Sequence, residues 1–195
     1  VIGIFPGSRT QEVQHLLPTM ISAIQIIAKK YPGYTFKLAC ASKNLLKDIK
    51  TAASKSKVSI EIVFDSRQLI LESYVSIVAS GTITLEHAMV GTPCVVCYKL
   101  NPISYYLTMK LVWKKIEEKC FGYIALPNIL LEKQIIPELL QNNFQVPKLV
   151  DEVANLLKSD NNNQVSKILL KINKKLDDGF SPIDKILQEI SSTIL

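Results

Sequence analysis

The sequence predicts an α/β protein in which a Rossmann-like parallel sheet carries helices on both faces and is followed by C-terminal helices. In the first half of the chain, short apolar runs typical of buried strands alternate with stretches whose apolar residues recur at helical spacing. Strands joined by helices in this way pair in parallel, because each crossover returns the chain to the same end of the sheet. Glycines at two strand-to-helix junctions, Gly7 and Gly81, indicate tight turns on one common rim.

Five strands are expected in this half, each a short apolar run bounded by turn residues. They cover residues 1–5, 35–41, 58–64, 75–79 and 93–98. After the first helix, a connecting helix is expected at residues 44–54. A short helix should follow the third strand and end at about Ser73, and another should run from the Gly81 turn to Gly91.

The helix after the first strand has the clearest pattern. Its apolar residues at helical spacing are Val13, Leu16, Leu17, Met20, Ile21, Ile24 and Ile27. Ser8 and Gln11 have the spacing of a capping box at its start. Pro18 interrupts the pattern, which predicts a kink or a later beginning of the helix, because proline has no N–H to donate.

The alternation weakens in the second half of the chain. A lysine-rich helix is expected at 102–119, a short strand at 123–126, helices at 134–142 and 147–157, a polar loop at 161–163, and final helices at 164–176 and 182–194. We therefore divide the chain into a Rossmann-like domain, residues 1–145, and a C-terminal helical segment, residues 146–195. The segment is expected to pack on that domain or on a preceding one.

Composition and charge narrow the classes of partner. The chain is 48% hydrophobic and 21% charged, as in ordinary globular proteins, and its net charge is +6. A basic protein favours an acidic partner such as a nucleotide, a phospholipid or a nucleic acid. The only arginines are Arg9 and Arg67, and no basic patch is interleaved with aromatic residues. Nucleic acid is therefore not expected as a partner.

The beginning of the sequence predicts more protein upstream. Residue 1 is not methionine and already lies in a predicted core strand, so we expect an excised part of a longer chain. No basic leader precedes this strand, and no apolar run approaches the ~18 residues of a spanning helix. We expect a cytoplasmic protein that is at most attached to a membrane surface.

Cysteine and histidine patterns give no strong signal for metal or redox chemistry. Cys94 and Cys97 form a Cys-x-x-Cys within a predicted strand, where positions three apart point to opposite faces. Since no second cysteine pair or histidine cluster completes a zinc site, buried reduced thiols are expected. His15 and His87 lie near the predicted turns, but neither is set beside a nucleophile, and structural or solvated roles are favoured.

The turn at Pro6-Gly7-Ser8-Arg9 joins a predicted buried strand to a helix. Glycine lets the backbone approach a ligand, and a helix start directs free N–H groups at an anion. The guanidinium of Arg9 is suited to phosphate oxygens. Neither a Walker loop nor a Gly-x-Gly-x-x-Gly motif is present, so this turn alone equally fits a plain junction with a solvated arginine.

The segment from Ser80 to Glu86 repeats this arrangement after the fourth strand. Ser80, Gly81 and Thr82 place small hydroxylated residues around a glycine, and Glu86 lies one turn into the next helix. Such residues also serve as ordinary helix caps. Two phosphate-type turns on one rim nevertheless favour a nucleotide site over two plain junctions.

Four segments occur in the order and spacing found in lipid-A-disaccharide synthases. They are Phe5-Pro6-Gly7-Ser8-Arg9-x-x-Glu12-Val13, Ala79-Ser80-Gly81-Thr82-x-Thr84-Leu85-Glu86, Leu126-Pro127-Asn128-Ile129-Leu130 and Pro137-Glu138-Leu139-Leu140-Gln141. One such motif would be weak evidence, but four in register are specific. The chain resembles the C-terminal, nucleotide-binding portion of this family over essentially its whole length.

The resemblance implies one half of a GT-B fold, in which two Rossmann-like domains face each other across a cleft. The family transfers 2,3-diacylglucosamine from UDP-2,3-diacylglucosamine to a lipid acceptor, 2,3-diacylglucosamine 1-phosphate. The products are lipid A disaccharide 1-phosphate and UDP. By resemblance, the substrate-binding residues are Gly7, Ser8 and Arg9 at the diphosphate, with Ser80, Gly81 and Thr82 lining it, Glu86 at the ribose, and Asn128, Glu138 and Gln141 completing the pocket.

The resemblance also implies what this chain lacks. The general base is expected to be a carboxylate of an upstream domain, so no catalytic residue is expected here and the chain alone should be inactive. No Asp-x-Asp motif is present, and neither a metal ion nor a cofactor is expected. Members can form homodimers that exchange C-terminal segments, and the expected place of work is the inner face of the inner membrane.

Three features remain open at this point. Lys133 stands where the family has an arginine, which weakens bidentate binding there, and segment 112–122 is longer than expected. The stretch around Lys110, Lys114, Lys115 and Lys119 is basic and amphipathic, which suits either an anionic membrane surface or a solvated helix face.

Two alternative functions remain. One is another GT-B enzyme of UDP-sugars, such as an epimerase or the peptidoglycan glycosyltransferase, and the other is a non-catalytic binding module.

Overall fold

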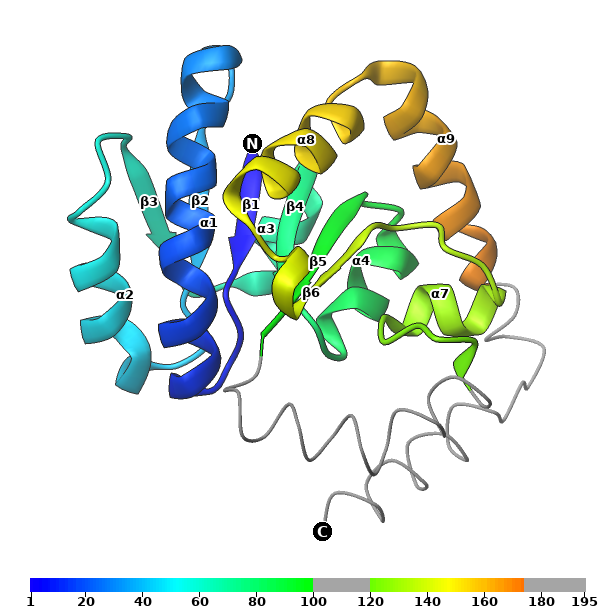
Figure 1. Cartoon of the computed structure of the whole chain (residues 1–195), viewed down its shortest axis with the longest axis horizontal. Coiled ribbons are helices and arrows are strands. Elements are labelled where there is room, and N and C mark those ends of the chain that lie inside the picture. Colours follow the sequence, from blue (N-terminus) through cyan, green and yellow to red (C-terminus); the bar gives the residue numbers. More distant parts are fainter. Residues whose placement is uncertain (100–119, 174–195) are drawn as a thin grey trace, which may run out of the picture.

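The chain folds around a sheet of six parallel strands in the order β3-β2-β1-β4-β5-β6 (Figure 1). A computed structural model describes residues 1–99 and 120–173. The strands are β1 (Ile2–Phe5), β2 (Phe36–Ala39), β3 (Ile60–Val63), β4 (Val75–Ala79), β5 (Cys94–Tyr98) and β6 (Glu138–Leu140). Every residue of β1 and β4 is buried, because helices cover the sheet on both faces.

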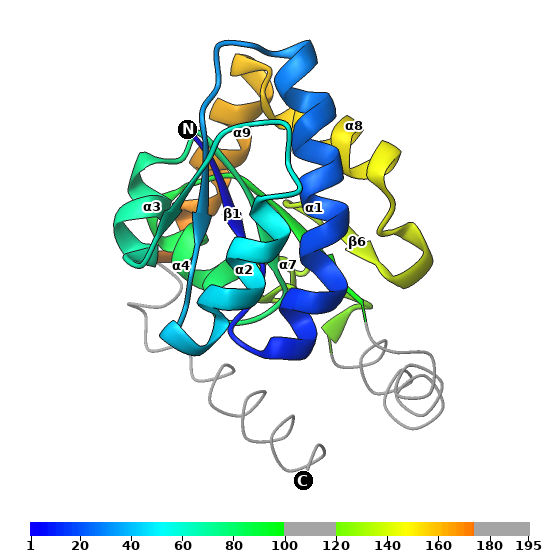
Figure 2. The same ribbon diagram turned by 90° about the vertical axis from the view of Figure 1, so that its left-hand side faces the viewer.

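Two layers of helices enclose the sheet (Figure 2). Their bounds are α1 (Thr10–Lys30), α2 (Leu46–Ala53), α3 (Ser66–Glu72), α4 (Ile83–Val90), α7 (Leu126–Leu131), α8 (Val146–Leu156) and α9 (Ser159–Leu169), with short 3₁₀ helices η1 (Lys43–Leu45) and η2 (Gln141–Asn143). Helix α1 packs with α2 and α8 on one face, and α4 packs with α3, α7 and α9 on the other. This arrangement is the predicted Rossmann-like α/β fold.

Helix α1 buries the whole apolar stripe that the spacing predicts, from Val13 to Ile27. The helix begins at Thr10 and continues through Pro18, so the predicted later beginning is wrong. Pro18 lies on the exposed side of the helix, where water can satisfy the carbonyl that proline leaves without a donor.

Two elements predicted between residues 123 and 142 are wrong. The strand expected at 123–126 is not formed, because α7 begins there at Leu126. The helix expected at 134–142 is instead β6 followed by η2, and β6 pairs with β5 in the register Val96 with Glu138. A three-residue strand has too short a pattern to distinguish it from a helix, and its pairing partner decides its conformation.

The asparagine run predicted as a loop is the first part of α9. Asn162 is buried, and its amide donates to the carbonyls of Tyr74 at 2.9 Å and Leu156 at 3.1 Å. These bonds tie α9 to the start of β4, so the polar residue stabilises the helix against the sheet.

The C-terminal segment shares the core of the sheet. Helix α8 contacts α1, β4 and β5, and its buried residues include Leu149, Val150 and Val153. The boundary at residues 145 and 146 remains a prediction. The helices predicted at 102–119 and 182–194 lie outside the described residues. In the part of the chain that the structure describes, no helix is long and apolar enough to span a membrane.

Candidate functional site

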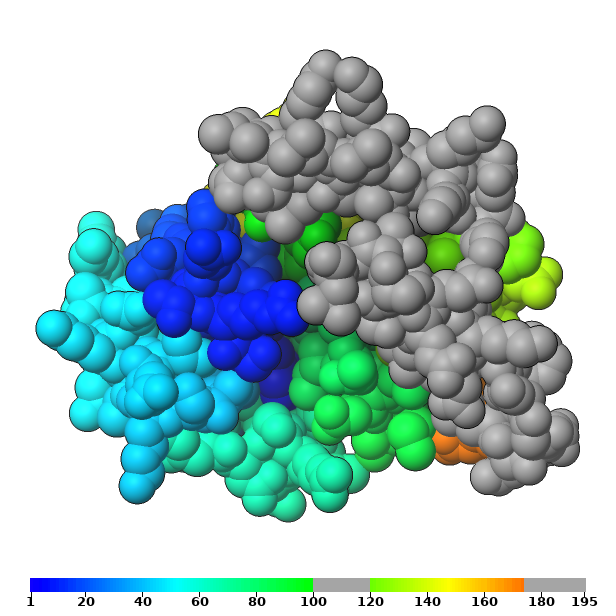
Figure 3. Space-filling model, turned by 90° about the horizontal axis from the view of Figure 1, so that it is seen from below, coloured from blue at the N-terminus to red at the C-terminus, as the bar shows by residue number. Residues whose placement is uncertain are grey.

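The two glycine turns lie side by side at the carboxyl ends of β1 and β4, which are neighbours in the sheet. The strand order reverses between these two strands, and ligands of open parallel sheets bind at such a switch point. Figure 3 looks onto this rim, where the segment after β1, in blue, adjoins the segment after β4, in green. The structure therefore brings together the two segments that the sequence predicts as phosphate-type turns.

The turn after β1 is held by the carboxylate of Glu12. Gly7 has a φ of 107°, and a Cβ there would collide with Glu12. Glu12 Oε2 accepts hydrogen bonds from the N–H groups of Ser8 at 3.1 Å and Arg9 at 3.3 Å. The capping residues of α1 are thus Arg9 and Glu12, and the predicted pair Ser8 and Gln11 is wrong.

This cap changes what the turn can offer a ligand. The N–H groups of Ser8 and Arg9 were expected to be free, but both already donate to Glu12. The exposed guanidinium of Arg9 remains available at the first residue before α1. Glu12 was not predicted as a site residue, although its spacing of three from Arg9 is the spacing of a capping box.

The turn after β4 keeps its polar groups accessible. The N–H of Ser80 donates to the Cys97 carbonyl at 3.0 Å, which fixes the start of the turn. Gly81 has a φ of 151° and open space where a Cβ would stand. Thr82 is exposed and Glu86 is half-buried in the first turn of α4. The predicted contacts of Thr82 and Glu86 with a nucleotide stay predictions.

His87 lies in the core behind this turn. It is fully buried, and its Nδ1 lies 2.8 Å from the Ile83 carbonyl oxygen. The rings of His87 and Phe5 pack in a T-shaped arrangement, with their centroids 4.8 Å apart. Burial lowers the pKa of His87 from its usual 6.5 to about 4. The imidazole is therefore neutral at pH 7 and packs in the core, and its buried Nε2 has no hydrogen-bond partner among the described residues.

This burial predicts a loss of stability in acid. Between pH 6.5 and 4 the unfolded chain binds a proton at His87 and the folded chain does not, so the free energy of unfolding falls as the pH falls. The loss should reach about 3 kcal/mol near pH 4 and then level off. Urea unfolding at several pH values, in the wild type and in His87→Leu, measures it. Parallel pH profiles for the two proteins would contradict this prediction.

Asn128 and Glu138 form a hydrogen-bonded network that joins α7 to β6. Asn128 is fully buried, and its amide donates to the Ile136 carbonyl at 2.9 Å and to Glu138 at 2.7 Å. Its oxygen accepts from the N–H groups of Ile135 and Ile136 at 2.7 and 3.0 Å. These bonds use the full hydrogen-bonding capacity of the Asn128 side chain.

Glu138 connects this network to the start of α7. Its carboxylate accepts from the N–H groups of Ile124 at 2.9 Å and Ala125 at 3.2 Å. Negative charge at a helix start is stabilising, so these contacts account for Glu138 without a ligand. The predicted pocket role of Asn128 and Glu138 stays a prediction, and the structure gives both residues an architectural one.

Gln141 is strained at the carboxyl end of β6. Its φ is 48°, a left-handed conformation that is uncommon for residues other than glycine. Its Nε2 is buried and has no hydrogen-bond partner among the described residues. A strained backbone with an unsatisfied donor is typical of binding sites, which supports the predicted role of Gln141.

Lys133, the predicted departure from the family pattern, follows α7. Its side chain is exposed, and its N–H donates to the Asn128 carbonyl at 3.1 Å. Its effect on the pocket stays a prediction. Most of the longer segment 112–122 and the whole lysine-rich stretch from Lys110 to Lys119 lie outside the described residues.

The cysteines of the Cys-x-x-Cys are fully buried free thiols in β5. Burial raises the pKa of Cys94 and of Cys97 far above the usual value, so both thiols stay protonated. The prediction of buried reduced thiols is confirmed. Within residues 1–99 and 120–173, no group of three or more His, Cys, Asp or Glu side chains is placed to hold a metal ion.

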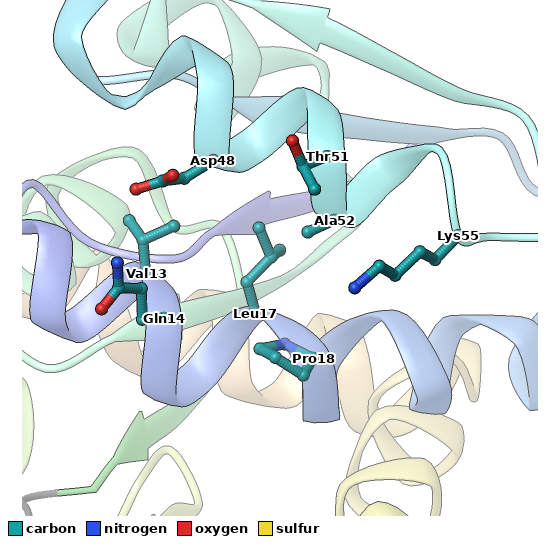
Figure 4. Close-up of a pocket in the computed structure, with 8 residues that line it drawn as sticks. All are labelled: Val13, Gln14, Leu17, Pro18, Asp48, Thr51, Ala52 and Lys55. Atoms are coloured by element: carbon teal, nitrogen blue, oxygen red, sulfur yellow. The ribbon is translucent and has the colours of Figure 1, made fainter.

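A groove of about 200 Å³ lies between α1 and α2 (Figure 4). Its lining residues are Val13, Gln14, Leu17, Pro18, Asp48, Thr51, Ala52 and Lys55. None of them belongs to the predicted site, although the N–H of Val13 donates to the carbonyl of Arg9 at 3.1 Å.

Comparison with known proteins identifies the family. A family model described as lipid-A-disaccharide synthetase matches residues 1–189. The lipid-A-disaccharide synthase of Trichlorobacter lovleyi is 32% identical over 181 residues, which cover 92% of this chain and 45% of the relative. That of Koribacter versatilis is 34% identical over 182 residues, which cover 91% of this chain and 45% of the relative. The chain thus spans about half the length of the curated relatives it matches.

A solved structure shows the same fold at low identity. A protein of Listeria monocytogenes, described as a UDP-N-acetylglucosamine 2-epimerase, has a TM-score of 0.55 and 14% identity, with 86% of this chain and 38% of that chain covered. At this identity the similarity shows the fold alone, and it agrees with the predicted Rossmann-like half of a GT-B protein. The family match, which extends over nearly the whole sequence, is the more specific finding. This chain belongs to the lipid-A-disaccharide synthase family.

Proposed function

We propose that this chain is the UDP-sugar-binding part of a glycosyltransferase of lipid A biosynthesis. The complete enzyme would condense UDP-2,3-diacylglucosamine with 2,3-diacylglucosamine 1-phosphate to lipid A disaccharide 1-phosphate and UDP. The observation that carries this proposal is the pairing of two glycine turns at the switch point of the sheet, in a chain of this family. The lipid acceptor and the general base would belong to the part of the relatives that this chain does not cover.

The rim offers the chemistry that a departing UDP requires. Negative charge gathers on the diphosphate as the glycosidic bond breaks, and preorganised cationic and hydroxyl donors stabilise it. Arg9 supplies the permanent charge, and Ser80 and Thr82 supply hydroxyl groups on the neighbouring strand end. In this proposal the diphosphate lies between the two turns, Glu86 accepts from the ribose, and Gln141 donates from the far side.

Glu12 gives this site a defined shape before the ligand binds. Because its carboxylate fixes the N–H groups of Ser8 and Arg9, the backbone before α1 is held in place. The diphosphate would then be bound through the Arg9 side chain and not through these two amides. Preorganisation of this kind lowers the entropic cost of binding.

Binding of UDP tests the proposed site. We expect UDP to shift the backbone amide NMR resonances of Gly7 to Arg9, of Ser80 to Glu86, and of Gln141. Resonances of Asp48 and Thr51, which line the groove between α1 and α2, serve as the internal control and should not move. Shifts confined to the groove, or no saturable shift at millimolar UDP, would overturn the site assignment.

A second candidate is another enzyme of UDP-sugars or a binding module without turnover. The Rossmann-like fold leaves this candidate open, because one fold can serve several unrelated activities. Transferase assays with both lipid substrates discriminate the two. We expect activity from the full-length protein and none from these 195 residues alone. A full-length protein that binds UDP but transfers no sugar would favour the second candidate.

The lipid substrates suggest where the enzyme works. We expect a cytoplasmic protein that acts at the inner face of the inner membrane, where the net charge of +6 would favour an anionic surface. A homodimer is a further expectation from the family resemblance.

A further inference from the structure

Tyr98 is the last residue of β5 and lies between the strand ends that carry the predicted site. On one side, the Ser80 N–H donates to the carbonyl of Cys97, the residue just before Tyr98. On the other side, Tyr98 pairs with Leu140, the residue just before Gln141. The sheet therefore holds Tyr98 between the serine turn and the strained glutamine.

The Tyr98 side chain is half-buried and also lies within the electrostatic reach of the turn after β1. Burial raises the pKa of its phenol, the negative charge of Glu12 raises it further, and the positive charge of Arg9 lowers it. The hydroxyl is therefore protonated at neutral pH and can donate a hydrogen bond. Glu12 and Arg9, which follow β1, are therefore close enough to act electrostatically on Tyr98 at the end of β5.

The Tyr98 hydroxyl has no hydrogen-bond partner within residues 1–99 and 120–173. The hydroxyl is also not sealed in the core formed by these residues, so a ligand at the rim can reach it. Here the hydroxyl belongs to a half-buried ring that is influenced by the charge of Glu12 and by that of Arg9, a residue proposed to bind an anion. A neutral donor next to a permanent cation is well suited to an oxygen that shares negative charge.

We infer that Tyr98 is a further ligand-binding residue of this site, and that its hydroxyl donates to the diphosphate of the bound nucleotide between Arg9 and Gln141. This inference rests on the proposed function, since it names an additional contact to the same UDP. It assigns the diphosphate and not the uridine to Tyr98, because Arg9, the proposed diphosphate ligand, is one of the two charged residues that act on the phenol, and the other, Glu12, is already engaged in capping α1. No residue of β5 is among the positions that the sequence predicts for the site.

Tyr98→Phe tests this contact, because it removes the hydroxyl and keeps the ring. In the full-length protein, calorimetric titration should show a roughly tenfold weaker affinity for UDP. Affinity for uridine should stay within about twofold of the wild type, and the melting temperature should be unchanged. Tyr74→Phe is the matched control, since Tyr74 lies at the opposite, amino-terminal end of the sheet, where its N–H donates to Val1.

The outcomes separate this inference from the proposed function. If the wild type binds no UDP, the proposed function fails. If the wild type binds UDP and Tyr98→Phe binds it equally well, the inference is overturned and the proposed function stands. An equal loss of affinity for UDP and uridine, or a similar loss in Tyr74→Phe, would also overturn the diphosphate assignment.

Discussion

Arg9→Ala is expected to lower kcat/KM of the full-length enzyme by about 10²–10³-fold, the usual effect of removing one preorganised donor to developing negative charge. Arg9 is exposed at the start of α1, and its backbone is fixed by Glu12, so truncating its side chain should leave the fold intact. The loss should be larger in kcat/KM than in the affinity for UDP-2,3-diacylglucosamine, because charge on the departing diphosphate grows at the transition state. Steady-state kinetics with both lipid substrates measures the effect, and a thermal melt confirms folding.

Two variants sharpen this test. Arg9→Lys should restore activity only in part, because an ammonium keeps the charge but lacks the planar fork that binds two phosphate oxygens. Arg67→Ala is the matched control: Arg67 is the only other arginine and is exposed on α3, which begins at the same rim beyond the edge strand β3. A folded Arg9→Ala enzyme with a rate within about twofold of Arg67→Ala would exclude the diphosphate role.

Asn128→Ala is expected to lower the free energy of unfolding by about 3–4 kcal/mol, since it leaves several buried polar groups without partners. The N–H groups of Ile135 and Ile136 would lose their acceptor, and Glu138 would lose a donor at 2.7 Å. The side chain that disappears is fully buried, so a cavity adds to the cost. Urea unfolding monitored by circular dichroism measures the change.

The same variant decides between the two roles considered for Asn128. If Asn128 holds the segment between α7 and β6, Asn128→Asp should also be destabilised, because a carboxylate would replace the donor that faces Glu138. Asn44→Ala, at an exposed asparagine in η1, should leave the stability within about 0.5 kcal/mol of the wild type. An Asn128→Ala protein of normal stability that binds UDP poorly would show the opposite, a ligand-binding role.

The sequence by itself determined the first half of the fold and the placement of the two glycine turns. The strand at Val75–Ala79 has the predicted bounds, and the apolar stripe of α1 is buried as its spacing predicts. These predictions succeed because local periodicity and burial point to the same conformation there. The two glycine turns could be placed on one rim from the sequence, since parallel strands joined by helices all end on the same side.

Only the tertiary structure decided the second half and the contacts of the site residues. Glu138–Leu140 is a strand because β5 offers it a pairing edge, and the asparagines of α9 are helical because Asn162 bonds to Tyr74 and Leu156. Glu12 turned out to occupy the amides expected to face a ligand, and Tyr98 lies beside Ser80 and Leu140 through pairings between strands. Such contacts join residues that are distant in sequence or depend on side-chain geometry, and neither is encoded in the local pattern from which elements are predicted.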